Sequence, residues 1–132
     1  MKAQSSLETL LLMAGILAFF VAVIPFVNKA ADATTLVAEK TFHQAELEKV
    51  TAAANEAGAF GPGNSFDVTI TMKTPGLLTI GNGEAKLFLE EKNLTVKSNV
   101  TVKASARVIL PKGKTKLTAA NDEGEISVKA QG

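Results

Sequence analysis

The chain has 132 residues, 46% of them hydrophobic, and its 14 Lys and Arg residues nearly balance its 13 Asp and Glu residues. A formal net charge of +1 argues against the dense basic surface that nucleic-acid binding needs, so no nucleic-acid partner is expected. The chain has no Cys and one His, which excludes thiolate sites and argues against a His-based metal centre or catalytic triad. We therefore expect no catalytic residues, no metal site, no cofactor and no enzyme activity.

The N-terminal third contains a long uncharged stretch. Residues 9–28 carry no charge, and residues 10–27 read LLLMAGILAFFVAVIPFV. As a helix, residues 10–27 would be about 27 Å long, close to the roughly 30 Å hydrocarbon core of a bilayer. Pro25 cannot donate a helical hydrogen bond, so a kink is expected there. The stretch is predicted to enter or nearly span a membrane.

A short leader precedes this stretch: residues 1–3 read MKA and residues 4–8 read QSSLE. Together with the apolar run that follows, this order resembles the class III signal peptide of archaeal type IV pilins, and the resemblance ends with the apolar run. It implies that a prepilin peptidase cuts between Ala3 and Gln4, so that Gln4 becomes the N-terminus and Glu8 the fifth mature residue. A cut ahead of the apolar run keeps that run on the mature protein, where it would serve in assembly.

Glu8 needs an explanation, because a lone carboxylate in an apolar environment costs roughly 3 kcal/mol on insertion scales. The resemblance implies that Glu8 of one copy pairs with the free amine of Gln4 of a neighbouring copy. Alternatively, Glu8 lies at the headgroup boundary and needs no partner. The first interpretation predicts a helical homopolymer, built by the pilus assembly machinery from a precursor that is inserted in the cytoplasmic membrane.

Beyond the apolar stretch the pattern becomes that of an amphipathic helix. Apolar residues recur every three or four positions, and no Gly or Pro interrupts residues 26–57. With Gly58 as the expected C-cap, one helix is predicted over residues 4–58, of which 4–28 are the hydrophobic part. A helix of about 80 Å must pack on other chains, on a head domain or on both. His43 is expected to be a surface or interface residue of this helix, since no second His or Cys could join it.

A break rich in Gly and Pro at residues 59–65 marks the start of a different region. Beyond it the hydrophobic period changes from 3.6 to 2, which predicts about seven antiparallel strands. Asn82-Gly83 signals a type I′ hairpin turn. Residues 93–110 alternate between polar and apolar, and they form either one long bent strand or two strands that turn at residues 97–99.

The expected fold is α+β, with a single long N-terminal helix and a C-terminal antiparallel β-sheet or sandwich head over residues 59–132. The head has few large aromatic residues and no disulfide. We therefore expect the second half of the helix to pack on it and complete its core. Pilin-like proteins, which the N-terminus resembles, carry a β-rich head in this place.

Two N-glycosylation sequons lie in the head, Asn93-Leu94-Thr95 and Asn99-Val100-Thr101. Both Asn residues fall on the polar positions of the alternation, so their side chains should point away from the core. Glycosylation of an exported chain is one interpretation, and chance is the other, because a Thr-rich β chain readily produces such triplets.

These features predict the structural subunit of an archaeal type IV pilus, which polymerises through its apolar helix into an extracellular adhesion filament at the cell surface. Three alternatives stay open. One is a minor pilin or secretion pseudopilin of the same architecture, and another is a membrane-tethered binding protein that never polymerises. The third is a secreted β protein that is released by cleavage after Ala33.

Overall fold

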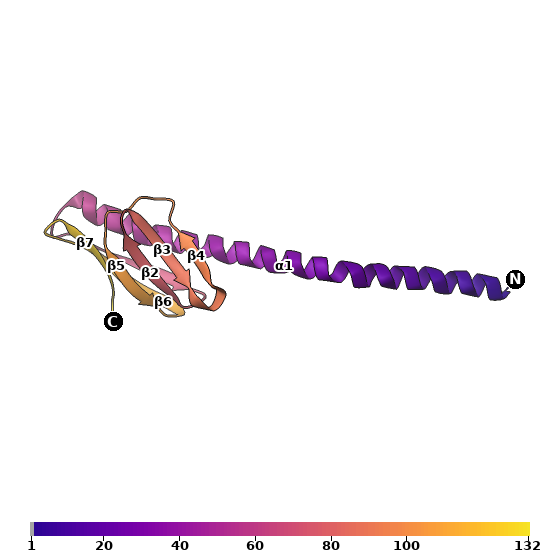
Figure 1. Ribbon diagram of the computed structural model, residues 1–132. Helices are drawn as coiled ribbons and strands as arrows, with labels where there is room; N and C mark the ends of the chain where they lie inside the picture. The colour runs from indigo at the N-terminus through magenta and orange to yellow at the C-terminus, as the bar shows by residue number, and fades with distance from the viewer. Residues whose placement is uncertain (1) are drawn as a thin grey trace. The chain divides into compact units, whose positions relative to one another are not determined.

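The computed structural model describes residues 2–132, and it divides by internal contacts into two units, Met1–Ala38 and Glu39–Gly132. One long helix runs through both units, and all the strands belong to the second (Figure 1). The predicted α+β class is confirmed. In chain order the elements are α1 (Lys2–Phe60), β1 (Ser65–Met72), β2 (Gly76–Gly81), β3 (Glu84–Leu89), the 3-10 helix η1 (Glu90–Lys92), β4 (Leu94–Lys97), β5 (Ala106–Leu110), β6 (Gly113–Asp122) and β7 (Glu125–Ala130).

The helix α1 is longer at both ends than the sequence predicts. It includes both sides of the predicted cleavage point after Ala3 and continues through Pro25 without a break. Met1, which belongs to the predicted leader, lies outside the described residues. The expected C-cap at Gly58 is wrong, because α1 ends at Phe60 and Gly61 adopts the left-handed φ of 83° that is typical of a residue just past a helix end.

Gly58 has a packing role instead. A Cβ atom placed on Gly58 would lie 2.7 Å from Cδ1 of Ile126 in β7, which is closer than real Cβ atoms approach other atoms. The glycine therefore allows the end of α1 to lie against β7. The side chain of Asn121, at the end of β6, donates a hydrogen bond of 3.1 Å to the carbonyl of Ala57 and ties the same turn of helix to the head.

The strands form two antiparallel sheets, as the period-2 pattern predicts. One has the order β1-β6-β7 and the other β4-β3-β2-β5. The β2–β3 connection is the predicted hairpin: Asn82 and Gly83 have φ values of 54° and 82°, as a type I′ turn requires. The β6–β7 turn uses Glu123 and Gly124 in the same way, with φ values of 53° and 98°.

The region of residues 93–110 is not one long strand. It contains two strands, β4 and β5, which do not pair with each other: β4 pairs with β3, and β5 pairs with β2. The connection over residues 98–105 is longer than the predicted three-residue turn. Val102 in this connection is nevertheless fully buried, and its N–H donates to the carbonyl of Gly83 at 3.1 Å.

The core lies between the inner faces of the two sheets and the covered part of α1, all within the second unit. Buried side chains of the helix and of both sheets belong to one hydrophobic cluster, as expected for a helix that completes the head. The members are Leu47, Val50, Ala53, Ala54, Ala57, Ile70, Met72, Leu78, Ile80, Ala85, Leu87, Leu89, Val96, Val102, Leu110, Leu117, Ala119 and Val128.

Two ionisable side chains of α1 are buried beside this core. His43 is 0% exposed, so of the two expected positions it has the one at an interface, where the head covers α1. Glu46 is 5% exposed; its Oε2 accepts the backbone N–H of Thr71 at 2.7 Å, and its Oε1 lies 2.5 Å from Nζ of Lys49. A hydrogen-bonded and paired carboxylate can be buried at an acceptable free-energy cost, and here it connects α1 to the edge strand β1.

Candidate functional site: the exposed apolar segment of α1

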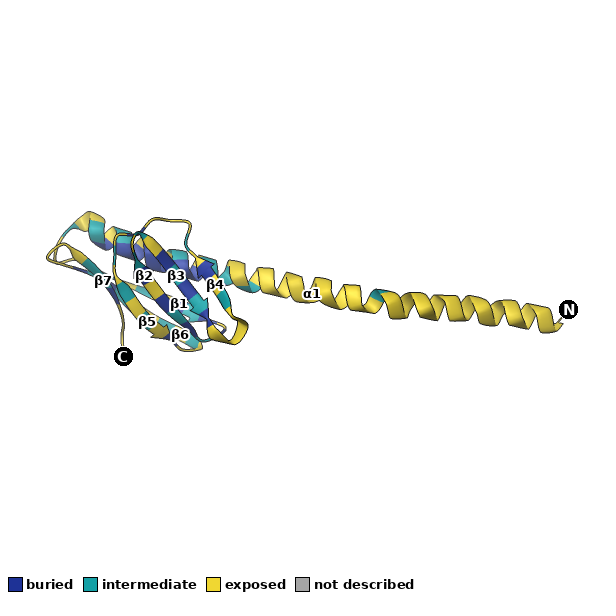
Figure 2. Ribbon diagram, in the orientation of Figure 1, coloured by how far each residue is buried: buried dark blue, intermediate teal, exposed yellow. Residues whose placement is uncertain are grey.

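The most unusual surface of the chain is the apolar segment, which we define as residues 10–27 of α1. Every residue from 2 to 38 is exposed except the half-buried Val23 (Figure 2). The large apolar side chains of the segment that are exposed are Leu10, Leu11, Leu12, Met13, Ile16, Leu17, Phe19, Phe20, Val21, Ile24, Phe26 and Val27. No described residue covers these side chains, whereas a soluble monomer rarely exposes apolar patches larger than a few hundred Å².

The helix that carries the segment is long and apolar enough to cross a membrane, and its most apolar stretch is 0% buried. The core helix of a soluble protein would be mostly buried in its own chain. The segment is therefore compatible with insertion in a membrane. A signal sequence has similar length and composition, so the residues ahead of the segment distinguish the two cases.

The residues singled out for cleavage and assembly lie on the exposed surface of α1. Ala3, Gln4 and Glu8 are all exposed, and Gln4 and Glu8 are one helical turn apart on the same face. Within the described residues no ion pair involves the side chain of Glu8. Pairing of Glu8 with the amine of Gln4 in another copy stays a prediction.

Both sequons are accessible in the head. Asn93 is exposed and has a left-handed φ of 47° at the end of η1, and Asn99 is exposed in the connection over residues 98–105. Asn99 thus lies between two strands, as the second alternative for residues 93–110 predicts, and its exposure is as expected. Thr95 and Thr101, which complete the two sequons, are exposed as well. Attachment of a glycan stays a prediction.

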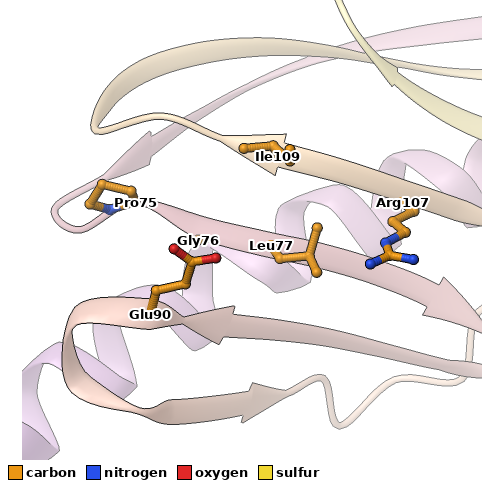
Figure 3. Close-up of a pocket in the computed structure, with 6 residues that line it drawn as sticks. All are labelled: Pro75, Gly76, Leu77, Glu90, Arg107 and Ile109. Carbon is orange, nitrogen blue, oxygen red and sulfur yellow. The ribbon is translucent and has the colours of Figure 1, made fainter.

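A shallow hollow of about 390 Å³ lies on the outer face of the four-stranded sheet (Figure 3). Leu77 and Ile109, from the adjacent strands β2 and β5, form its apolar part, and Arg107 and Glu90 lie toward opposite ends. No ion pair joins Arg107 to Glu90 among the described residues. Nor do three or more His, Cys, Asp or Glu side chains gather anywhere in residues 2–132 as a metal ion would require.

Two electrostatic contacts attach α1 to the head just before its first buried residue, His43. Oε2 of Glu39 lies 2.7 Å from Nζ of Lys92 in η1, and this hydrogen bond holds the pKa of Glu39 below its usual range. Lys73, just after β1, places its Nζ 4.4 Å from the ring centroid of Phe42. These contacts attach α1 to the ends of β1 and η1.

Glu46 is buried, although a charged residue in an amphipathic helix is expected on the side that faces solvent. The signal that could have placed it correctly is its spacing, since Glu46 lies three residues after His43 and next to Leu47, and all three side chains are buried. A helix that shares a core with two sheets buries a wider arc than the apolar stripe alone indicates.

No protein-family model, no curated protein and no solved structure matches this chain. The residues of the chain and their geometry therefore support the functional proposal on their own.

Proposed function

We propose that this chain is the structural subunit of an archaeal type IV pilus, which polymerises through its apolar segment into an extracellular adhesion filament. One observation carries the proposal: the apolar segment is exposed except at the half-buried Val23, and it begins two residues after the Gln4 to Glu8 sequence. A segment kept on the mature chain needs a permanent apolar environment, which lipid supplies before assembly and other copies supply afterwards.

The energetics of this exchange depend on packing. Lipid tails are as apolar as Leu side chains, so moving the segment from a bilayer into a filament core changes little in apolar burial. Close packing and polar contacts between helices then decide which arrangement is stable. Ala14, Ala18 and Ala22 follow one another at a spacing of four, so they share one face on which neighbouring helices can approach closely.

Glu8 supplies the polar contact. In a filament core a lone carboxylate is disfavoured, whereas a carboxylate that is paired with the amine of Gln4 from the next copy is not. Because only one arrangement of neighbouring helices forms that pair, Glu8 selects the register of the polymer. The amine exists only after cleavage, so processing by the peptidase precedes assembly.

The second unit is suited to the outside of such a filament. Its core is complete within residues 39–132, so the head does not need a neighbour in order to fold. The exposed Asn93 and Asn99 are available for glycosylation after export. The head therefore presents the surface that meets other cells or solid supports.

The test is expression of the full chain in an archaeal host that has a prepilin peptidase. We expect the mature protein to begin at Gln4 and to occur in filaments visible by electron microscopy. Glu8→Gln should be cleaved normally and yield few filaments, whereas the control Glu91→Gln, which changes an exposed carboxylate of η1, should assemble like the unmodified chain.

Other results would identify the alternatives. A chain that begins at Met1 and stays monomeric in the membrane indicates a tethered binding protein, and a chain that begins at Thr34 indicates a secreted one. Filaments in which this chain is scarce indicate a minor pilin or pseudopilin. Normal filament yield from Glu8→Gln contradicts the role proposed for Glu8.

A further inference from the structure

The charges of the head are unevenly distributed along β6. Lys112, Lys114 and Lys116 lie at the start of this strand, and Asp122 and Glu123 lie at its end, followed by Glu125 at the start of β7. A strand of 10 residues spans about 33 Å. One basic and one acidic group of side chains therefore lie at opposite ends of the head.

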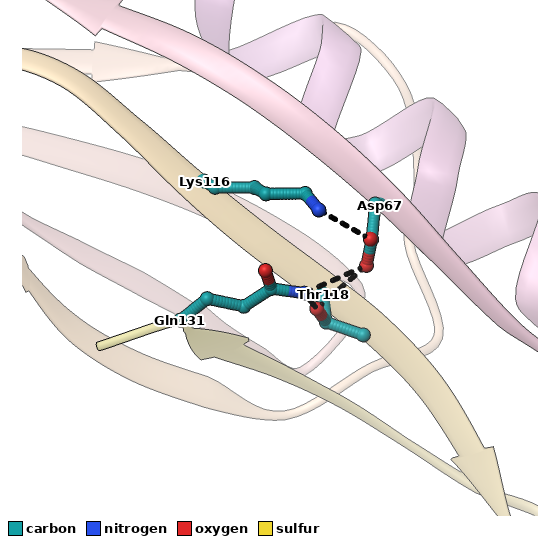
Figure 4. A network of polar contacts seen from close by, with 4 residues as sticks. All are labelled: Asp67, Lys116, Thr118 and Gln131. Carbon is teal, nitrogen blue, oxygen red and sulfur yellow. Dashed lines mark hydrogen bonds and ion pairs between the residues drawn. The ribbon is translucent and has the colours of Figure 1, made fainter.

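Some of these charges are already neutralised within the chain. Nζ of Lys116 lies 2.8 Å from Oδ2 of Asp67, and Thr118 and Gln131 donate hydrogen bonds to Oδ1 of the same Asp67 (Figure 4). In contrast, none of the ion pairs in the described chain involves Lys112 or Lys114, and none involves an acidic residue of the β6–β7 turn.

A third lysine adds to the positive charge at the start of β6. Met72 pairs with Gly113, which brings the exposed Lys73 to the end of the head where Lys112 and Lys114 lie. We call these three lysines the basic end. Glu90 lies nearby, beside Pro75 in the hollow described above, and opposes part of this charge.

At the other end of β6, we call Asp122, Glu123 and Glu125 the acidic end. All three are exposed. The exposed Glu56 precedes Ala57, whose carbonyl is bound by Asn121, so it adds to the same end. Lys103 lies near Glu125 in a surface hollow and is the opposing charge there.

The acidic end is also held in a defined conformation. The β6–β7 turn is closed by a hydrogen bond of 3.0 Å from the N–H of Gly124 to Oδ1 of Asn121, while the Nδ2 of Asn121 binds the carbonyl of Ala57. The backbone that carries these carboxylates is thus anchored to α1. A preorganised charged surface loses little conformational entropy when it binds an oppositely charged partner.

We propose that the acidic end of one copy contacts the basic end of the next copy in the assembled filament. The occupant is a second copy because each chain carries both complementary surfaces, at opposite ends of one strand. Such a head-to-tail contact is heterologous and can repeat indefinitely, as a filament requires. This inference rests on the proposed function and adds a second, electrostatic interface to the one that the apolar segments form.

The first test uses filaments of the unmodified chain and a carbodiimide, which joins an amine to a carboxylate only when the two are in contact. Lys112 and Lys114 are about 25–35 Å from the acidic end of their own chain, so a bond between them must join two copies. Mass spectrometry should find peptides that link Lys112 or Lys114 to Asp122, Glu123 or Glu125. The pairs Lys92–Glu39 and Lys116–Asp67, at 2.7 and 2.8 Å, are internal positive controls.

The second test reverses charges. Lys112→Glu with Lys114→Glu, or Asp122→Lys with Glu123→Lys, should each reduce the fraction of chain that sediments as filament several-fold. A variant with all four substitutions exchanges the charges of the two ends, and its sedimenting fraction should return to that of the unmodified chain. Lys97→Glu with Lys129→Glu changes the net charge as the Lys112/Lys114 pair does, but at other exposed positions, and it should leave the sedimenting fraction unchanged. Thermal unfolding of each variant shows whether the head is folded.

The outcomes separate the two proposals. If the unmodified chain forms no filaments, the proposed function fails and this inference fails with it. If filaments form and the control pairs are crosslinked but no link joins the two ends, only the inference is wrong. Reversed-charge variants that fold and sediment like the Lys97/Lys129 control also overturn it, and so does a combined variant that is not restored.

Discussion

The two parts of α1 bury their side chains in the opposite order from their hydrophobicity. Residues 10–27 are rich in Leu, Phe and Val and are almost entirely exposed, whereas the Ala-rich part that begins at His43 buries eight side chains in the head. Burial of apolar side chains drives folding, so the more hydrophobic part should be covered first if a single chain were the complete assembly.

The difference indicates where each part finds its apolar partner. The covered part has its partner in the same chain, and small residues such as Ala54 and Ala57, both 0% exposed, allow the sheets to lie close to the helix backbone. The apolar segment has no partner among the described residues. Under the proposed function its partner is lipid before assembly and other copies afterwards.

The largest expected effect comes from truncating one leucine in each part. Leu47 is 2% exposed and Leu17 is 64% exposed. We expect Leu47→Ala to lower the free energy of unfolding of the head by about 2–5 kcal/mol, because it leaves a cavity in the shared core. Leu17→Ala should change it by less than about 0.5 kcal/mol. Hydrogen exchange of the β6 amides, measured on the detergent-solubilised chain, reports this free energy. Equal effects at the two positions would contradict the comparison.

A smaller effect is expected from the buried carboxylate that ties α1 to β1. Glu46→Ala leaves the N–H of Thr71 without its acceptor, and we expect a loss of about 1–3 kcal/mol in the free energy of unfolding. The matched control is Glu48→Ala, since Glu48 is half-buried and its side chain only accepts a 3.4 Å hydrogen bond from Gln44. The control should lose less than about 0.5 kcal/mol. Hydrogen exchange of the β6 amides measures both losses. A Glu48 variant as unstable as the Glu46 variant would show that the hydrogen bond from Thr71 to Glu46 is not the cause of the loss.

Much of the fold could be predicted because its signals are local. The long helix follows from uninterrupted 3.6-residue periodicity, and the β2–β3 hairpin follows from Asn82 and Gly83, which readily adopt positive φ. Alternation over residues 93–110 correctly predicted that Val96, Val102 and Leu110 are buried. It could not show which strands pair, because alternation indicates which face of a strand is buried and not the strand beside which it lies.

The remaining differences depend on tertiary packing. Gly58 is typical of a helix end, but it lies inside α1, where a Cβ atom would lie 2.7 Å from Cδ1 of Ile126. The burial of His43 and Glu46 depends on what the head places opposite them. For the candidate assembly site, sequence and structure agree only on exposure, because the contacts proposed for Glu8 and Gln4 involve a second copy.

His43 is the first buried residue along α1, so it marks the point at which the covered part begins. Neither ring nitrogen has a hydrogen-bond partner within the described chain. Burial lowers the pKa of His43 below its usual range; Glu39 and Glu46 on α1 oppose this shift, and Lys73 after β1 adds to it. The folded head therefore favours the neutral imidazole.

Protonation of His43 should have the smallest effect on stability of the three predictions. The sign of this effect follows from the lowered pKa of His43 in the folded state. A lowered pKa in the folded state means that the unfolded chain takes up a proton first, near its ordinary pKa of about 6.5. Stability should be complete above that pH and should fall as the pH drops from about 7 to 5. Carboxylates whose pKa is lowered, such as Glu39 and Asp67, lose their contribution to stability only below their ordinary pKa values of 4.5 and 3.8. Their titration therefore lies outside this window.

Thermal unfolding followed by circular dichroism at pH 7 and at pH 5 measures the effect. The unmodified chain should lose several degrees of unfolding temperature between these two values, whereas His43→Leu, which keeps an apolar side chain at the position but cannot be protonated, should lose much less. The exposed part of α1 provides the control. Glu8→Gln changes a carboxylate far from any buried residue, so it should leave the pH dependence of the head intact. If His43→Leu keeps the full dependence on pH, protonation at the start of the covered part is not its cause, and other groups in the head must titrate in this range.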